Sequence, residues 1–169
     1  MIDSDPLFVE EEGGDFHITF FSPCRDAGSN ASVPPDVPED FEGDERIAGG
    51  TVDMGADEFF FHLYHHGNVT PGGVVEVRII GGPGMPVRLA LGSGVKDPPL
   101  QTIYGDLWIE RPLMALFSIG SIGADGVLSY SRKVPSFWNP GEEKPFQALV
   151  GSLWGVNTRL TNLMVLQVE

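Results

Sequence analysis

The chain has 169 residues, of which 41% are hydrophobic, and this is enough for one domain or two small domains with a real core. Its 22 glycines and 14 prolines favour many turns and argue against a helical bundle. The net charge of −14 argues against nucleic acid as a partner, because an acidic surface repels phosphate backbones.

The charge is unevenly distributed along the chain. Residues 1–60 hold 16 acidic residues against two arginines, whereas residues 61–169 hold eight acidic and eight basic residues. This asymmetry predicts two regions with different roles, which we place at 1–58 and 59–169. Cations or cationic surfaces are natural counterparts of the acidic region, and solubility is the simpler explanation of its charge.

The first 20 residues have no basic start and no apolar run of signal length, so we expect no signal peptide in this chain. No stretch approaches the ~20 apolar residues of a membrane span. The single cysteine, Cys24, cannot form a disulfide within the chain and is interpreted as a buried structural thiol.

The N-terminal region alternates short extended pieces with loops. Residues 15–21 predict a strand with Phe16, Ile18 and Phe20 on one face. Residues 28–50 are rich in Gly, Pro, Asp, Glu and Ser, and they predict a long surface loop.

From residue 59 onward, short apolar runs are separated by turn signals. The predicted strands are 59–66, 74–80, 86–91, 107–111, 113–120, 126–132, 146–153 and 162–168. Residues 98–104 carry the one helical pattern, which their prolines weaken. The fold class is therefore all-β, with an antiparallel β-sandwich of the jelly-roll or immunoglobulin-like kind after an extended segment.

The extended segment contains five sequence blocks in a fixed order. They are DPLFV from Asp5, DFHI from Asp15, SPCRDAG from Ser22, DFEGDER from Asp40 and GTVDMGADEF from Gly50. Together they resemble the last rung and C-terminal cap of secreted bacterial right-handed parallel β-helix proteins, which are pectate-lyase-like and adhesin-like. In that family a β-sandwich often follows the solenoid.

The resemblance implies the end of a scaffold and an extracellular or cell-surface location. It carries over no active site, because the family's catalytic residues lie on earlier rungs. A lone rung cannot bury its interior, so the sandwich or a second copy must cover it, and we expect a homo-oligomer. Within the blocks, Asp26 and Asp53 are expected to accept backbone N–H bonds and fix tight turns.

The acidic loop around Gly43 is the best candidate for a metal site. Hard oxygen ligands at alternate positions around a glycine are typical of Ca²⁺ loops, although the full EF-hand spacing is missing. The candidate ligands are Asp36, Asp40, Glu42, Asp44 and Glu45. The alternative is an ion pair of Arg46 with Asp40 or Asp44 that fixes the loop without metal.

The sequence offers no convincing catalytic group. His62 and His66 fall on one face of a strand and His65 on the other, so the three cannot easily share one ion. No nucleophile has a recognisable base, and the GxSxG and HExxH patterns are missing. We therefore expect a protein that is not an enzyme and needs no cofactor other than Ca²⁺.

Aromatic side chains suggest a binding role. Trp138 lies in a loop and Tyr130 in a predicted strand, and exposed aromatics of this kind stack on sugars; Trp108 and Trp154 are expected in the core. The first interpretation is a non-enzymatic extracellular or cell-surface module with a structural or adhesive role. The alternative is a carbohydrate-binding accessory domain of a polysaccharide-active protein. An enzyme that uses the acidic loop is the least favoured interpretation.

Overall fold

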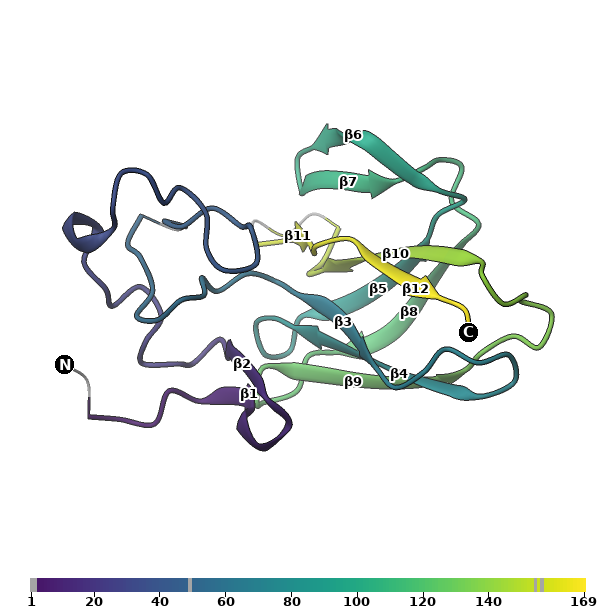
Figure 1. Ribbon diagram of the computed structural model, residues 1–169, viewed down its shortest axis with the longest axis horizontal. Helices are drawn as coiled ribbons and strands as arrows, with labels where there is room; N and C mark the ends of the chain where they lie inside the picture. The colour runs from purple at the N-terminus through teal and green to yellow at the C-terminus, as the bar shows by residue number, and fades with distance from the viewer. Residues whose placement is uncertain (1–2, 49, 154, 156) are drawn as a thin grey trace. The chain divides into compact units, whose positions relative to one another are not determined.

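The computed structural model describes residues 3–48, 50–153, 155 and 157–169 and is all-β (Figure 1). It divides into two compact units, Met1–Phe60 (unit 1) and Phe61–Glu169 (unit 2), two residues beyond the predicted boundary. No helix among the described residues is long and apolar enough to cross a membrane.

Unit 2 contains two main antiparallel sheets. The first has the order β3-β4-β9, formed by Leu63–His66, Val74–Ile80 and Val127–Lys133. The second has the order β11-β10-β5-β8, formed by Arg159–Leu160, Glu143–Val150, Pro86–Leu91 and Ala115–Ser121. Strand β12, Met164–Gln167, also pairs with β10.

The core of unit 2 lies between these two sheets. Alternate residues of β4 (Val75, Val77, Ile79) and of β5 (Val87, Leu89) are buried and belong to one apolar cluster. This is the period of two that a half-buried strand requires. Strands of both sheets contribute to the cluster, which is the arrangement expected of a β-sandwich.

The two sheets are joined along one side. Val69, after β3, forms a parallel bridge with Val168, after β12, and the N–H of Glu169 donates to the carbonyl of Val69. On the other side the outer strands β8 and β9 are connected by the turn at residues 122–126, where the N–H of Gly123 donates to the carbonyl of Val127.

A separate hairpin is formed by β6 (Val95–Thr102) and β7 (Gly105–Ile109), and Figure 1 shows it beside β10 and β11. The helical pattern at residues 98–104 was therefore misleading, since most of this segment is strand. Prolines are tolerated here because β6 is an outer strand, where no neighbouring strand needs the N–H that proline lacks.

Seven of the eight predicted strands of the C-terminal region overlap an observed strand over most of their length, and 74–80 and 86–91 have the predicted bounds. The eighth, 59–66, shortens to Leu63–His66. The sequence patterns did not reveal β1, β6 or β11.

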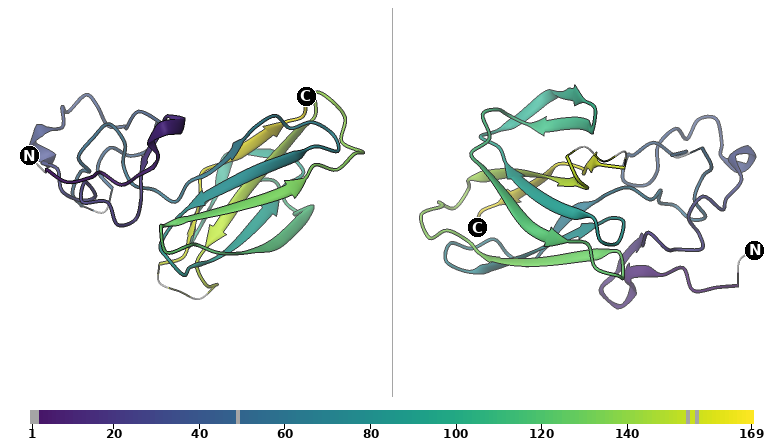
Figure 2. Two further views of the ribbon diagram at one scale, coloured as in Figure 1. Left: turned by 90° about the horizontal axis from the view of Figure 1, so that it is seen from below. Right: turned by 180° about the vertical axis from the view of Figure 1, so that it is seen from behind.

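Unit 1 is mostly loop. It contains one antiparallel hairpin, β1 (Phe8–Glu10) and β2 (Asp15–Ile18), joined through the short 3₁₀ helix η1 (Glu11–Gly13), and a second 3₁₀ helix η2 (Asn30–Ser32) (Figures 1 and 2). The strand predicted at residues 15–21 ends at Ile18. Ile18 is buried, whereas Phe16 on the same face is 57% exposed.

Buried carboxylates hold the loops of unit 1. Asp53 accepts hydrogen bonds from the backbone N–H groups of Asp26 (2.5 Å) and Phe59 (2.6 Å), as predicted for this residue. Asp26 was also expected to accept backbone N–H bonds, but in this pair its own N–H is the donor. Its backbone adopts a φ of 53°, and its carboxylate oxygen lies 3.6 Å from Nε of Arg25. Cys24 is half-buried rather than fully buried.

The prediction for Arg46 was wrong about its partner. Its guanidinium contacts Glu58 at 2.5 Å and the Gly55 carbonyl at 2.6 Å, rather than Asp40 or Asp44. Burial raises the pKa of Glu58, and backbone hydrogen bonds from Asp53 and Ala48 partly oppose the rise. Unit 1 therefore relies on a buried, hydrogen-bonded ion pair where a larger unit would use apolar packing.

Candidate functional site

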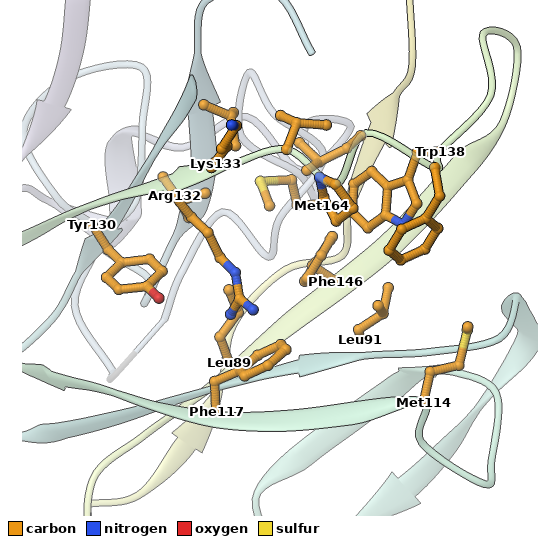
Figure 3. Close-up of a pocket in the computed structure, with 16 residues that line it drawn as sticks. Leu89, Leu91, Met114, Phe117, Tyr130, Arg132, Lys133, Trp138, Phe146 and Met164 are labelled. Atoms are coloured by element: carbon orange, nitrogen blue, oxygen red, sulfur yellow. The ribbon is translucent and has the colours of Figure 1, made fainter. Parts of the chain in front are cut away.

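The candidate site is an apolar cavity of about 240 Å³ within unit 2, shown in Figure 3. Strands of both sheets and the loop before β10 line it. The lining residues are Val75, Val77, Leu89, Leu91, Met114, Phe117, Tyr130, Arg132, Lys133, Val134, Pro135, Phe137, Trp138, Phe146, Met164 and Leu166. Apart from Tyr130, Arg132 and Lys133, they are apolar side chains.

One wall is formed by the β3-β4-β9 sheet. Val75 and Val77 of β4 lie directly opposite Arg132 and Tyr130 of β9. Directly opposed residues share a face of a sheet, so these four side chains belong to its inner face. A charged residue thus occupies an inward position at the outer strand of this sheet.

The other wall is formed by the second sheet. Leu89 lies opposite Phe117, and Leu91 lies opposite both Ala115 and Phe146. Met164 of β12 lies opposite Phe146 of β10. This register places a continuous apolar surface across four strands.

The rim of the cavity is unusually apolar for an exposed surface. Phe137 is 79% exposed and Met114 is 62% exposed. The loop that carries Phe137 is anchored at both ends. The N–H of Val134 donates to the carbonyl of Gly73 at one end, and the N–H of Gly141 donates to the carbonyl of Val168 at the other. An exposed aromatic ring on an anchored loop is the type of feature that marks a binding site.

Arg132 spans the opening between the two sheets. Its guanidinium carbon lies 4.2 Å from the centroid of the Phe117 ring, so it stacks on a residue of the facing sheet (Figure 3). Among the described residues, no carboxylate forms an ion pair with Arg132 or Lys133. The rim therefore carries uncompensated positive charge.

The nearby Lys144 differs in this respect. Its ammonium lies 5.3 Å from the centroid of the Trp138 ring and 2.8 Å from the Glu142 carboxylate. Hydrogen bonds from Lys144 and Asn139 lower the pKa of Glu142 to about 2. The charge of Lys144 is therefore already neutralised within the chain.

Both residues that the sequence proposed for ligand binding, Trp138 and Tyr130, line this cavity. Trp138 is half-buried, with its ring centroid 6.5 Å from that of Phe146. Trp108, expected in the core, is half-buried, and Trp154 lies outside the described residues. Arg132, Phe117, Met114 and Phe137 also line the cavity and were not predicted from the sequence. An arginine at an inward position of the predicted strand 126–132 was the available signal.

The five proposed calcium ligands lie in unit 1 with different surroundings. Asp40 accepts hydrogen bonds from the N–H groups of Glu42 and Asp44, both at 2.9 Å, and from that of Glu58 at 3.1 Å. Glu42 contacts His17, and the side chains of Asp36 and Glu45 are exposed. Asp40 and Glu42 thus have partners inside the protein, and calcium binding stays a prediction.

The His17 ring lies between two carboxylates. Its Nδ1 is 2.6 Å from Asp15 and its Nε2 is 2.9 Å from Glu42. Burial alone would lower the pKa of His17, but hydrogen bonds with Glu42 and Asp15 outweigh it and raise the pKa to about 9. The charged imidazolium therefore connects the β1–β2 hairpin to the acidic loop.

This arrangement predicts a pH-dependent stability of unit 1. The pKa of His17 is higher in the folded than in the unfolded chain, so its protonation stabilises the folded state. This contribution to the free energy of unfolding is complete below pH ~6.5 and is lost as the pH rises through ~9. The loss is on the order of 2 kcal/mol. NMR titration of His17 should give the raised midpoint, and urea unfolding of unit 1 followed by its NMR signals should give the loss. Glu42→Gln should lower the midpoint by about one unit, and an ordinary imidazole titration in both proteins would contradict the assignment.

The remaining histidines give no converging set within unit 2. His62 is buried before β3, and His65 and His66 are adjacent residues of β3, whose side chains point to opposite faces. The geometry of the described residues thus favours the cavity over the histidine cluster as a site.

No protein-family model matches the chain, and no curated protein is significantly similar to it in sequence.

Proposed function

We propose that this chain is a non-enzymatic binding module that holds an apolar ligand between the two sheets of unit 2. The observation that carries the proposal is the cavity of about 240 Å³, with apolar walls and an exposed aromatic rim. An apolar molecule that enters an apolar cavity removes its own surface from contact with water, which is favourable. A smaller apolar cavity, of about 150 Å³, is enough to bind benzene in an engineered protein.

Carbohydrate binding fits the same residues less well. Trp138 and Tyr130 could supply stacking surfaces, but a sugar also needs several hydrogen-bond partners for its hydroxyl groups. The polar side chains of the lining are Tyr130, Arg132 and Lys133 alone. The chemistry of the lining therefore supports an apolar ligand over a polysaccharide.

The sequence blocks of residues 5–59 support the rest of the proposal. Their resemblance to the cap of a parallel β-helix favours a module carried at the end of a larger extracellular or cell-surface protein, with an adhesive or structural role. The jelly-roll or immunoglobulin-like class of the sandwich is part of the same proposal. Self-association is supported by three exposed phenylalanines of unit 1, Phe16, Phe21 and Phe41.

The proposal predicts that filling the cavity removes binding without loss of stability. Leu89 is 4% exposed and contributes to the cavity wall, so Leu89→Phe should fill part of the space and weaken binding of 1-decanol at least tenfold. The melting temperature should stay the same or rise. Binding is measured through the change in tryptophan fluorescence on titration with the alcohol, since Trp138 lines the cavity.

Leu116→Phe is the matched control. Leu116 lies next to Phe117 in β8, is 58% exposed and is not among the lining residues. Its substitution should leave decanol binding unchanged. Failure of the wild-type protein to bind decanol would remove the proposed function, and equal binding by the wild type and Leu89→Phe would move the site elsewhere.

A further inference from the structure

We infer that the ligand of this cavity is a fatty acid of medium chain length, held with its carboxylate at Arg132. This inference rests on the proposed function and adds the class of ligand and the residue that recognises its polar end. Three observations carry it: the unpaired charge at the rim, the position of that charge relative to the apolar wall, and the size of the cavity.

The rim carries charge of one sign only. Residues 61–169 hold eight acidic and eight basic residues, yet both charged residues among those that line the cavity are cations, Arg132 and Lys133. Lys144, close by, has its own carboxylate in Glu142, whereas neither rim cation has one among the described residues. An arginine fork presents paired N–H donors that match the two oxygens of a carboxylate.

Arg132 places a positive charge next to the apolar walls of the cavity. It lies opposite Val75 in the register of β4 and β9, and its guanidinium contacts the ring of Phe117 in the facing sheet. In Figure 3 the side chain extends from β9 across the cavity toward Phe117 and Leu89. A carboxylate bound at this guanidinium would place its alkyl chain directly against the apolar walls.

The size of the cavity sets the chain length. Benzene, with six carbons, fits an apolar cavity of about 150 Å³, which is ~25 Å³ for each carbon. On this scale the cavity of about 240 Å³ accepts a chain of about ten carbons. A longer chain would extend past Phe137 and Met114 into solvent.

The test compares decanoate with 1-decanol, both below the concentration at which they self-associate. The full chain should bind decanoate about tenfold more tightly than decanol, because a charge-assisted hydrogen bond is added to the same apolar burial. High salt should reduce this difference. From octanoate to decanoate, affinity should rise about fourfold for each methylene, and the gain should fall off beyond about ten carbons.

Arg132→Gln should reduce decanoate affinity to that of decanol and leave decanol binding unchanged. Lys144→Gln is the control, because its charge is already neutralised, and it should not change the preference. The decanol measurement also shows that the variant remains folded. If Arg132→Gln leaves the preference intact, or if decanol binds as tightly as decanoate, the inference is overturned while the proposed function stands.

A different outcome would reveal a different role for Arg132. Inward charges on an outer strand also prevent edge-to-edge association of sheets. Should Arg132→Gln associate more strongly than the wild type in sedimentation experiments, with no change in ligand preference, the arginine protects the β9 edge and the fatty-acid assignment is wrong. If neither decanoate nor decanol binds, the proposed function fails, and this inference fails with it.

Discussion

Arg46→Met is expected to lower the free energy of unfolding of unit 1 by about 3–5 kcal/mol. Glu58, its partner, is 1% exposed and also accepts the N–H of Asp53 at 2.8 Å. Loss of the guanidinium leaves the Glu58 carboxylate buried without its cation, in the same part of unit 1 as the buried carboxylate of Asp53. The cost is the desolvation of an unpaired charge, which exceeds the value of the lost contact itself.

The two units can be followed separately because all tryptophans and tyrosines lie in residues 61–169. Tryptophan fluorescence reports on unit 2, whereas hydrogen exchange at the amides of Asp26 and Phe59, both bonded to Asp53, reports on unit 1. In Arg46→Met, exchange at these two amides should accelerate by more than a hundredfold if it proceeds through unfolding of unit 1.

Two variants test the cause of this effect. Arg46→Met combined with Glu58→Gln should recover a large part of the loss, because glutamine still accepts the N–H of Asp53 and carries no charge. Arg78→Met removes an arginine whose partner, Glu76, has a side chain 35% exposed, and it should cost less than about 1 kcal/mol. A loss below 1 kcal/mol for Arg46→Met would show that the buried pair is not what stabilises unit 1.

Strands with strong local sequence signals were predicted, and strands without them were missed. Strands β4 and β5 had regular alternation between glycine and proline turns, and their bounds were predicted to the residue. Strand β6 was missed because Pro98 and Pro99 conceal a strand whose pairing is set by β7. Pairing partners separated along the chain cannot be read from local periodicity.

Part of the candidate site could also be predicted from local sequence. Trp138 and Tyr130 were identified from their residue types and their places in a loop and a strand. The cavity itself depends on strands far apart in sequence, such as β4 with Val75 and β12 with Met164, which both contribute to its lining. The partner of Arg46 was also predicted wrongly, because charge and proximity in sequence favoured Asp40 or Asp44 over the buried Glu58.

A second large effect is expected at Gln147, which joins the β6–β7 hairpin to β10. Its side chain is 1% exposed, and its Oε1 accepts the N–H of Trp108 at 3.0 Å. Its Nε2 donates to the carbonyls of Asp106 (2.8 Å) and Thr161 (2.7 Å). Gln147→Leu keeps a similar volume but leaves three backbone groups without their partner. Because part of this surface can regain water, we expect a loss of about 2–4 kcal/mol.

The loss should be concentrated in the hairpin, because Gln147 provides the side-chain hydrogen bonds that connect β7 to the sheet. Exchange at the amide of Trp108 should accelerate more than exchange in β4, and urea unfolding of unit 2 should shift to lower denaturant. Gln101→Leu is the matched control, since Gln101 lies in the same hairpin with an exposed side chain, and it should change stability by less than about 0.5 kcal/mol. Equal effects of the two substitutions would mean that apolar packing, rather than this hydrogen-bonded amide, holds the hairpin against the sandwich.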